Sequence, residues 1–291
     1  MDKIVTSRVT SLYRLALQVP NLEEVKAFYA NVWKLRPTSA GAGVASFRSA
    51  AVDHDDLFLS EGERSVDHIA FEVASHADLA TLTDRLERAG FPSLPKPSRL
   101  LDDGHATASF TDPDGRKVEL VVADGDHCPL EVSDDPLAPL RIGHVVFWTK
   151  DQQETENFYR LLGFQITDRT HIGMSFLRCN ADHHTLALVK SESGKTGLQH
   201  IAFDVRSIDN VMKNFSRLRA LDVECVWGVG RHGPGNNVFS YYSDPAGNFI
   251  EYYGEMDLYS FDDVEEPRIW GPEHKGDVWG VAGIPPQAFR E

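Results

Sequence analysis

The sequence predicts an α+β protein made of two tandem domains, each built from two βαβββ units. Three pairs of matching segments support this prediction. The pairs are residues 12–29 with 142–159, 67–73 with 199–205, and 112–115 with 244–247. The first pair is offset by 130 residues and the other two by 132. One duplication with a small insertion explains all three pairs, so both halves of the chain are expected to fold in the same way.

The composition fits two domains of ordinary size and argues against nucleic acid as a partner. The chain has 291 residues, 42% of them hydrophobic, and a formal net charge of −15. Phosphate backbones are bound by clustered Lys and Arg, so this acidic balance disfavours nucleic acid and anionic membrane surfaces. No stretch approaches the roughly 18 consecutive apolar residues of a membrane-spanning helix. We therefore expect a small-molecule partner and no membrane association.

The cysteines give no sign of a disulfide framework or of a thiolate zinc site. Cys128, Cys179 and Cys225 are odd in number, and none of them lies in a CxxC motif. This usage fits a reducing cytoplasm. The N-terminal sequence contains no long apolar segment of the kind found in secretory signals. We expect a soluble, cytoplasmic protein.

Each half begins with an apolar strand followed by an amphipathic helix. The strands are expected at residues 12–19 and 142–149. Asn21 and Asp151 follow them, each with a glutamate three positions later, which is the pattern of a helix N-cap. Apolar residues then recur at spacings of three and four, as on one face of a helix. They are Leu22, Val25, Phe28, Tyr29 and Val32 in the first half, and Phe158, Leu161 and Leu162 in the second.

Short strands and a second strand-helix unit complete each half. The short strands are expected at residues 44–48, 57–59, 174–178 and 185–190. The next strands begin at His68 and His200 and lead into helices near residues 78–89 and 210–221. Each half then ends in a hairpin whose turn reads Asp-Pro-Asp-Gly or Asp-Pro-Ala-Gly.

The stretch from Gly228 to Gly254 organises the second half. It is expected to form a glycine-rich loop, a strand, a tight turn and a second strand. Side chains alternate along a strand, so Phe249 and Glu251 share one face, where an unpaired buried carboxylate would cost several kcal/mol. The segment 228–233 also satisfies GxGxxG. No helix start follows it, so a dinucleotide site is not expected.

Three residues of the second half predict a metal site. His144, His200 and Glu251 each stand near the start or end of a predicted strand. Two imidazoles and a carboxylate are the ligand set of non-haem Fe(II) sites with open coordination positions. The matching residues of the first half are Arg14, His68 and Glu119. Arginine is always protonated and cannot bind a metal, so we expect the first half to lack a site, with Arg14 left to pair with Glu119.

Four further motifs accompany these three residues. They are Gly143-His-Val-Val146, His183-His-Thr-Leu-Ala-Leu188, Leu198-Gln-His-Ile-Ala-Phe203 and Gly230-Arg-His-Gly233, together with Tyr241 ahead of Glu251. With them, the chain resembles the type I extradiol ring-cleavage dioxygenases of the vicinal oxygen chelate superfamily, the relatives of catechol 2,3-dioxygenase and homoprotocatechuate 2,3-dioxygenase. The resemblance covers about residues 10–254. It implies the vicinal oxygen chelate, or glyoxalase-like, fold.

The resemblance also implies the cofactor and the acid-base residue. His144, His200 and Glu251 would hold Fe(II), or in some relatives Mn(II), and leave positions for a catechol and O2. His184 would be the catalytic acid-base residue, because in the family the second histidine of the pair precedes the Thr-Leu-Ala-Leu strand. His183 is the alternative.

Substrate-binding residues are implied by the same resemblance. His232 and Tyr241 would bind the ring oxygens of the substrate and so take part in catalysis, with Tyr242 as the alternative tyrosine. Arg231 is expected to bind substrate as an anchor for an acidic substituent, and Arg268 is a second such anchor. The implied substrate is a mono- or bicyclic catechol that the sequence does not identify further.

The implied reaction is extradiol, or meta, cleavage of a catecholic aromatic compound with incorporation of both atoms of O2. The product would be of the 2-hydroxymuconic semialdehyde type, as in the catabolism of aromatic hydrocarbons. The alternative is a non-oxygenase member of the superfamily, either a glyoxalase-like isomerase or a small-molecule binding protein. Such proteins lack a set resembling His184, His232 and Tyr241.

The predicted divisions of the chain are 1–124, a linker at 125–139, a catalytic part at 140–254 and a tail at 255–291. The tail lies outside both repeats but carries large apolar residues. They are Leu258, Tyr259, Phe261, Ile269, Trp270, Trp279 and Val281. Burying a side chain of this size contributes about 1.5–3 kcal/mol. We therefore expect the tail to pack as a lid over residues 228–237 or as an interface arm in a homo-oligomer, with simple packing on the surface as the alternative.

Overall fold

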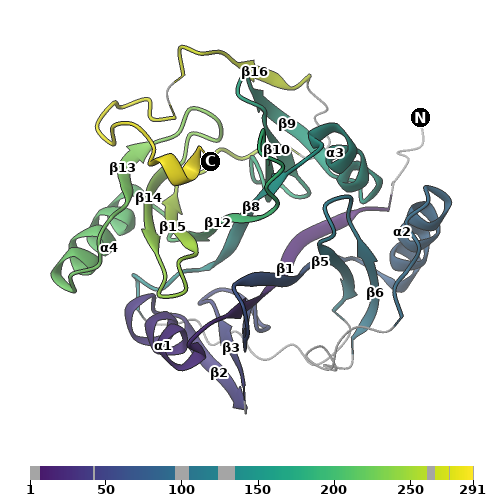
Figure 1. Ribbon diagram of the computed structural model, residues 1–291, viewed down its shortest axis with the longest axis horizontal. Coiled ribbons are helices and arrows are strands. Elements are labelled where there is room, and N and C mark those ends of the chain that lie inside the picture. The colour runs from purple at the N-terminus through teal and green to yellow at the C-terminus, as the bar shows by residue number, and fades with distance from the viewer. Residues whose placement is uncertain are drawn as a thin grey trace.

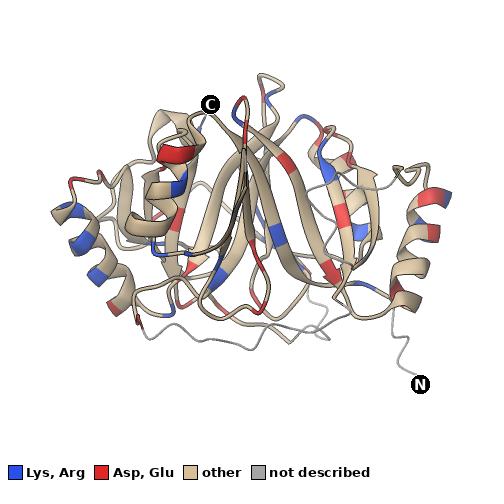
Figure 2. Ribbon diagram, turned by 90° about the horizontal axis from the view of Figure 1, so that it is seen from below, with Lys and Arg blue, Asp and Glu red and all other residues tan. Residues whose placement is uncertain are grey.

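The computed structural model describes residues 7–41, 43–95, 105–123, 135–260, 266–274 and 276–290. Each half of the chain forms one mixed β-sheet with two helices. Figure 1 shows the two sheets side by side, with α4 at one side of the molecule and α2 at the other. In Figure 2, the strands stand between helices at the two ends.

The first half forms a seven-stranded sheet in the order β2-β3-β4-β1-β5-β7-β6. Its elements are β1 (Val9–Val19), α1 (Leu22–Ala27), the π-helix η1 (Phe28–Val32), β2 (Arg36–Gly41), β3 (Val44–Arg48), β4 (Leu57–Glu61), β5 (Ser65–Val73), α2 (His76–Arg88), β6 (Ala106–Thr111) and β7 (Lys117–Val122).

The second half forms a nine-stranded sheet in the order β13-β14-β15-β12-β8-β11-β10-β9-β16. Its elements are β8 (Arg141–Thr149), α3 (Gln152–Leu161), β9 (Gln165–Thr170), β10 (Met174–Arg178), β11 (Leu186–Lys190), β12 (Gly197–Asp204), α4 (Ile208–Ala220), β13 (Trp227–Arg231), β14 (Val238–Ser243) and β15 (Phe249–Gly254). The tail adds β16 (Arg268–Trp270) and a 3-10 turn (Gln287–Phe289).

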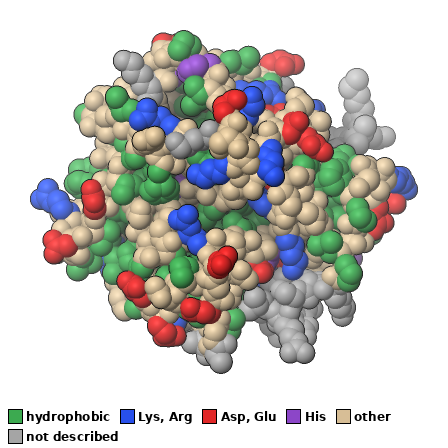
Figure 3. Space-filling view, in the orientation of Figure 1, with side chains coloured by type: hydrophobic (Ala, Val, Ile, Leu, Met, Phe, Trp, Pro, Cys, Tyr) green, Lys and Arg blue, Asp and Glu red, His purple; other side chains and the backbone are tan. Residues whose placement is uncertain are grey.

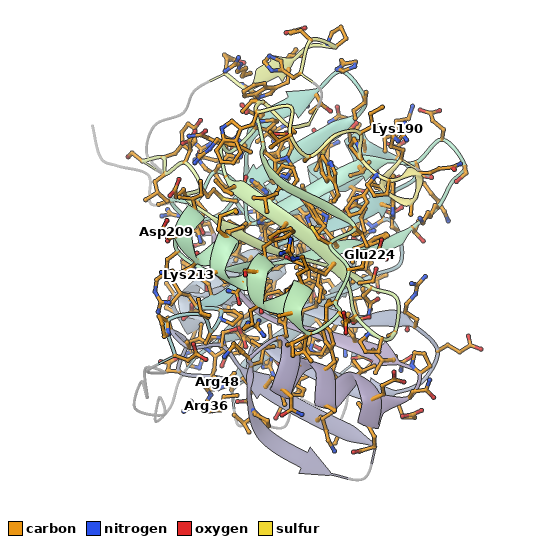
Figure 4. The ribbon with its side chains drawn as sticks, turned by 90° about the vertical axis from the view of Figure 1, so that its left-hand side faces the viewer. Arg36, Arg48, Lys190, Asp209, Lys213 and Glu224 are labelled. Atoms are coloured by element: carbon orange, nitrogen blue, oxygen red, sulfur yellow. The ribbon has the colours of Figure 1, made fainter. Side chains whose placement is uncertain are left out.

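The strands of the two sheets are paired in the same way. β1 pairs antiparallel with β5 and parallel with β4, and β8 pairs antiparallel with β12 and parallel with β11. Both units of the second half are complete βαβββ units, whereas two strands follow α2 in the described part of the first half. The α+β class and the tandem repeat are confirmed. α4, labelled by Asp209 and Lys213 in Figure 4, packs on β13, β14 and β15.

Both predicted helix starts are confirmed, but only Asp151 makes a side-chain capping hydrogen bond. The Asp151 side chain accepts a hydrogen bond from the Glu154 backbone N–H at 2.9 Å. Asn21 has a left-handed backbone, with φ of 55°, and makes no capping hydrogen bond. The Glu61 carboxylate accepts from the Leu22 N–H instead, at 2.9 Å. A carboxylate distant in sequence thus does the work that was expected of a local side chain.

Two tyrosine-aspartate hydrogen bonds join the halves reciprocally. Tyr29 of the first half donates to Asp244 of the second at 3.0 Å, and Tyr159 of the second donates to Asp112 of the first at 3.2 Å. All four residues belong to the repeated Phe-Tyr and Asp-Pro-X-Gly motifs. Figure 1 shows α1 beside the hairpin of β14 and β15. Each half therefore seats the first helical segment of the other against its own terminal hairpin.

Some predictions fall on parts of the chain that carry no description. Most of the predicted linker at 125–139 lies outside the described residues, as do Cys128 and Phe261. The predicted division of the chain therefore stays a prediction. In the part of the chain that the structure describes, no helix is long and apolar enough to cross a membrane.

Candidate metal centre

Three neighbouring strands bring His144, His200 and Glu251 together. His144 lies on β8, His200 on β12 and Glu251 on β15, and β12 stands between the other two strands. Each residue is no more than 4% exposed. The Nε2 atoms of His144 and His200 lie 3.3 and 3.2 Å from Glu251 Oε2. Potential ligand atoms of the three residues all lie within 4.8 Å of one another.

The hydrogen bonds around this cluster leave room for a cation. The Nδ1 atom of His200 contacts Gln199 Oε1, which can only accept, so Nδ1 carries the proton. A neutral His200 then turns the lone pair of Nε2 toward Glu251 Oε2. Both atoms are buried and lack a hydrogen-bond partner among the described residues. Two acceptors facing each other in a buried site fit a bound cation, so the residues present suit a metal.

The protonation states also suit metal binding. Burial by itself would raise the pKa of Glu251, but the imidazoles of His144 and His200 hold it below its ordinary value. Burial lowers the pKa of His200 to about 4, although the nearby Glu251 acts in the opposite direction. A carboxylate and neutral imidazoles are the forms that bind a metal ion. These residues form a buried metal site.

A bulge explains how Gln199 reaches His200. Successive side chains on a regular strand point to opposite faces. The pairing of β12 with β8 shifts register between Leu198 and His200, and the shift lets Gln199 and His200 turn to one side. Asn237 also supports the site, since its side-chain amide donates to Glu251 Oε1 at 3.3 Å. Neither contact could be predicted from the sequence, because local bulges and the directions of loop side chains do not follow from periodicity.

His184 lies directly beside the metal ligands. Its ring centroid is 4.2 Å from that of His144. Burial lowers the pKa of His184 well below its ordinary value, and the neighbouring imidazoles of His144 and His183 lower it further. His183, the alternative, bonds to Asp168 and does not line the cavity beside the cluster.

His232 and Tyr241 form a hydrogen-bonded pair on the other side of the cluster. The Nδ1 atom of His232 donates to the Gly276 carbonyl at 2.7 Å, and its Nε2 atom accepts from the Tyr241 hydroxyl at 3.0 Å. Tyr241 faces Glu251 across β14 and β15. Tyr242, the alternative tyrosine, points the other way, and its ring lies 5.7 Å from that of Trp33 in the core. The carbonyl that orients His232 comes from the tail.

Arg231, predicted to anchor substrate, is not among the described residues that line the cavity beside the cluster. Its guanidinium pairs with Glu255 at 2.6 Å and stacks on the Trp279 ring at 5.0 Å. Alternation at the end of β13 explains this, because Arg231 precedes His232 and therefore points to the opposite face. Arg268, the second predicted anchor, stacks on Trp270 at 3.7 Å and lines a separate outer cleft.

A largely apolar cavity of about 360 Å³ opens beside the cluster. Its described polar lining includes His144, His184, Gln199, His200, His232 and Tyr241. Its apolar lining includes Val146, Ile172, Met174, Phe176, Trp227, Pro234, Trp270, Pro272, Pro285 and Phe289. Arg290 is the one arginine among the described lining residues. The tail thus supplies part of the cavity wall. Other apolar residues of the tail are exposed. Figure 3 shows apolar and charged side chains mixed on one face of the molecule.

Comparisons with known proteins agree with this arrangement. Residues 11–120 and 141–252 match the Glyoxalase/Bleomycin resistance protein/Dioxygenase superfamily. The chain is 30% identical to metapyrocatechase 2 of Cupriavidus necator over 219 residues, which cover 68% of this chain and 67% of that protein. It is 30% identical to biphenyl-2,3-diol 1,2-dioxygenase of Metapseudomonas furukawaii over 277 residues, covering 83% and 87% of the two chains. The crystal structure of a Mn(II)-bound glyoxalase from Novosphingobium aromaticivorans superposes with a TM-score of 0.88 at 31% identity, covering 97% and 94%.

Proposed function

This chain belongs to the Glyoxalase/Bleomycin resistance protein/Dioxygenase superfamily and, within it, to the extradiol catechol dioxygenases, and we propose that it cleaves a catechol with O2 at a single Fe(II). The product would be of the 2-hydroxymuconic semialdehyde type. The observation that carries the proposal is the buried pair of facing acceptors at His200 and Glu251, completed by His144.

His144, His200 and Glu251 are the residues that would hold the metal. When bound, Fe(II) supplies Lewis-acid polarisation of the catechol oxygens and a path for electrons between the ring and O2. Mn(II) is the alternative ion, since the related glyoxalase structure contains it. The cavity beside the cluster is lined by His144 and His200, so it would give the catechol and O2 access to the metal.

Residues around the ligands would handle the protons of the reaction. We assign His184 as the base that takes a proton from a catechol hydroxyl and later returns one, because it is buried, neutral and beside His144. The Tyr241 hydroxyl and His232 would hold a ring oxygen by hydrogen bonding. The Gly276 carbonyl fixes which nitrogen of His232 carries its proton.

The cavity lining favours an uncharged catechol that carries an apolar substituent. Apolar side chains dominate the wall, and no pair of basic residues faces the cluster among the described residues. A cavity of about 360 Å³ has the size of a small-molecule site and leaves space beyond one ring. A charged side arm would have to be desolvated against this wall, which is unfavourable.

To test the proposal, the protein would be loaded with Fe(II) under anaerobic conditions and then assayed with a panel of catechols in the presence of O2. We expect O2 uptake equal to substrate consumed, a yellow ring-fission product, and a higher kcat/KM for biphenyl-2,3-diol or 3-methylcatechol than for 3,4-dihydroxyphenylacetate. A glyoxalase-like isomerase is the second candidate, favoured by the related glyoxalase structure. Isomerisation of a glutathione hemithioacetal by metal-loaded protein that consumes no O2 with any catechol would replace the proposal.

A further inference from the structure

We propose that Trp270, Asp168 and His183 form a positioning chain that sets the tautomer of His184. In this arrangement His184 holds its proton on Nδ1 and presents an unprotonated Nε2 to the cavity. The inference deepens the proposed function, because it rests on His184 being the base of that reaction. It also gives the tail a direct connection to the reacting site.

The chain is continuous and buried. His183 Nε2 lies 3.0 Å from Asp168 Oδ2, and His183 Nδ1 lies 3.0 Å from His184 Nδ1. The Trp270 indole donates to the same oxygen of Asp168 at 2.5 Å. Asp168, His183 and Trp270 are 5%, 1% and 9% exposed. Water therefore has little access to these contacts.

Counting protons along the chain fixes the tautomers. The indole N–H can only donate, and the Asp168 carboxylate can only accept. His183 must then carry its proton on Nε2, which faces Asp168. In the proposed arrangement His183 is a neutral imidazole with one N–H, so its Nδ1 accepts and His184 Nδ1 donates. The other ring nitrogen of His184, Nε2, is left as a lone pair for the cavity that this residue lines.

The half without a metal site lacks three of these four residues: it keeps a histidine, His54, at the position of His183, and Trp270 of the tail has no counterpart there. The strand pairings align the two halves: Leu177 is paired with Leu186 in the second half, and Phe47 is paired with Leu57 in the first. Counting back two residues from these positions places Asp55 where the second half has His184. Phe176 faces Asp168, whereas the matching Ser46 faces Ser39. A buried chain needed only to hold the fold would be expected in both sheets, so its restriction to the sheet with the metal ligands ties it to the site.

The tail holds its end of the chain in place by backbone pairing. β16 runs parallel to β9, with Arg268 opposite Asp168 and Trp270 opposite Thr170. The His171 N–H donates to the Trp270 carbonyl at 2.9 Å. Trp270 and Asp168 are thus set by neighbouring strands, and orientation passes from the tail through His183 to His184.

Imidazole nitrogen NMR tests the tautomer without relying on turnover. We would record long-range proton-nitrogen spectra of the Zn(II)-loaded protein, whose metal is diamagnetic. We expect a protonated Nδ1 and an unprotonated Nε2 for His184. Substituting Asp168→Asn, which offers His183 a donor as well as an acceptor, should shift these signals toward the other tautomer, and Trp270→Phe should shift them less. A His184 that carries its proton on Nε2 in the wild-type protein overturns the proposal.

Kinetics of the Fe(II)-loaded variants provide a second readout. Residues that orient a catalytic group typically matter by roughly 10–100-fold, so Asp168→Asn should lower kcat by that factor with little change in KM or iron content. Asp182→Asn is the matched control, because Asp182 is a buried acid next to His183 in sequence that pairs with Arg141 instead. Equal kcat in Asp168→Asn and wild type, with unchanged His184 signals in both variants, overturns the chain while leaving the proposed function standing. A wild-type protein inactive on every catechol refutes the proposed function, and the NMR result then still decides the tautomer.

Discussion

Glu251 and Glu119 are equivalent residues that neutralise a buried charge in different ways. Both are fully buried and are separated by the repeat offset of 132. Glu119 pairs with the Lys117 ammonium at 2.9 Å, and His68 Nε2 lies 3.8 Å away. Glu251 has imidazoles and an amide around it, and its Oε2 has no hydrogen bond among the described residues. One buried carboxylate uses a side-chain cation, and the other suits a metal ion.

Removing a ligand should remove the metal while the fold survives. We expect His144→Ala and Glu251→Ala to weaken iron binding by more than about 100-fold, the upper end of what substitutions outside the ligand set cost. Iron per chain would be measured after desalting, with circular dichroism as the check on folding. His68→Ala, the equivalent position in the first half, is the control and should keep one iron per chain. Full iron in both ligand variants would show that the site lies elsewhere.

Acid should destabilise the metal-free protein. The folded-state pKa of His200 is lowered to about 4, so the folded protein resists a proton that the unfolded chain accepts near pH 6.5. The stability that a neutral His200 contributes is therefore fully present above pH 6.5 and is lost as the pH falls toward 4. The lowered pKa of Glu251 acts in the same direction below about pH 4.5.

Urea unfolding of metal-free protein between pH 7.5 and 4.5 measures this effect. We expect the contribution of His200 to the free energy of unfolding to fall by up to about 1 kcal/mol per pH unit. His200→Gln, which cannot titrate, should show a shallower pH dependence over the same range. A wild-type free energy of unfolding that is flat between pH 6.5 and 4.5 would contradict the lowered pKa of His200.

The strands that carry the metal ligands could be predicted from the sequence, but many of the contacts around the ligands could not. Alternating apolar residues and repeated motifs were sufficient to predict β8, β12 and β15 and to place the ligands on them. The resemblance favoured Tyr241 over Tyr242, and the structure places only Tyr241 opposite Glu251. The bulge at Gln199 was not predictable, since a register shift depends on the partner strand. Arg231 was expected to anchor substrate, but it pairs with Glu255, which no local pattern reports.

Helix caps also divide into those made by neighbouring residues and those made by residues distant in sequence. Asp151 caps α3 through its own neighbour Glu154, which a sequence pattern can report. Ser75 and Ser207 cap α2 and α4 in the same local way, although the predicted helices began two residues later. Glu61 caps α1 across 39 residues, and no local pattern encodes such a contact.

The reciprocal tyrosine-aspartate bonds should stabilise the packing of the two halves. Tyr29→Phe and Tyr159→Phe each leave a buried aspartate with one donor fewer, which costs about 1–3 kcal/mol. The two sites share no partner, so the double variant should lose roughly the sum. Chemical unfolding monitored by tryptophan fluorescence gives the values. Tyr253→Phe is the control, because its hydroxyl is buried without a hydrogen-bond partner among the described residues. A loss in Tyr253→Phe as large as in the other two would remove the role assigned to the aspartates.

At the scale of the whole molecule, the site is assembled from the second half and the tail. Gly276 accepts from His232, Trp270 donates to Asp168, and Phe289 packs against Phe249 with ring centroids 4.4 Å apart. The sequence showed that the tail is too apolar to remain in water. It could not show where the tail docks, because the tail has no counterpart in the first half from which a register could be inferred. Whether the tail also forms an interface in a homo-oligomer stays a prediction.

The tail should control substrate affinity more than metal binding. The Phe289 ring lies 4.9 Å from that of Tyr241 and 6.3 Å from that of His200, so it closes the cavity beside the ligands without contributing a donor atom. Apolar contact between a bound catechol and this ring would contribute up to about 1.5–3 kcal/mol to substrate binding, and each 1.4 kcal/mol corresponds to a factor of ten. Phe289→Ala should therefore raise KM for the preferred catechol at least about tenfold, with iron content unchanged. Ile284→Ala is the matched control, because this apolar tail residue is 77% exposed.

Truncation after Gly254 extends this test to the whole tail. The shortened protein should keep the three ligand residues and bind iron, yet lose most turnover, because it loses the cavity wall, the Gly276 carbonyl that accepts from His232 and the Trp270 indole that donates to Asp168. Light scattering on the same sample would detect a change of assembly, which separates a lid from an interface arm. A folded truncated protein with unchanged kcat, KM and mass per assembly would leave the tail without a role, since closing a site acts by excluding water and holding the substrate in place.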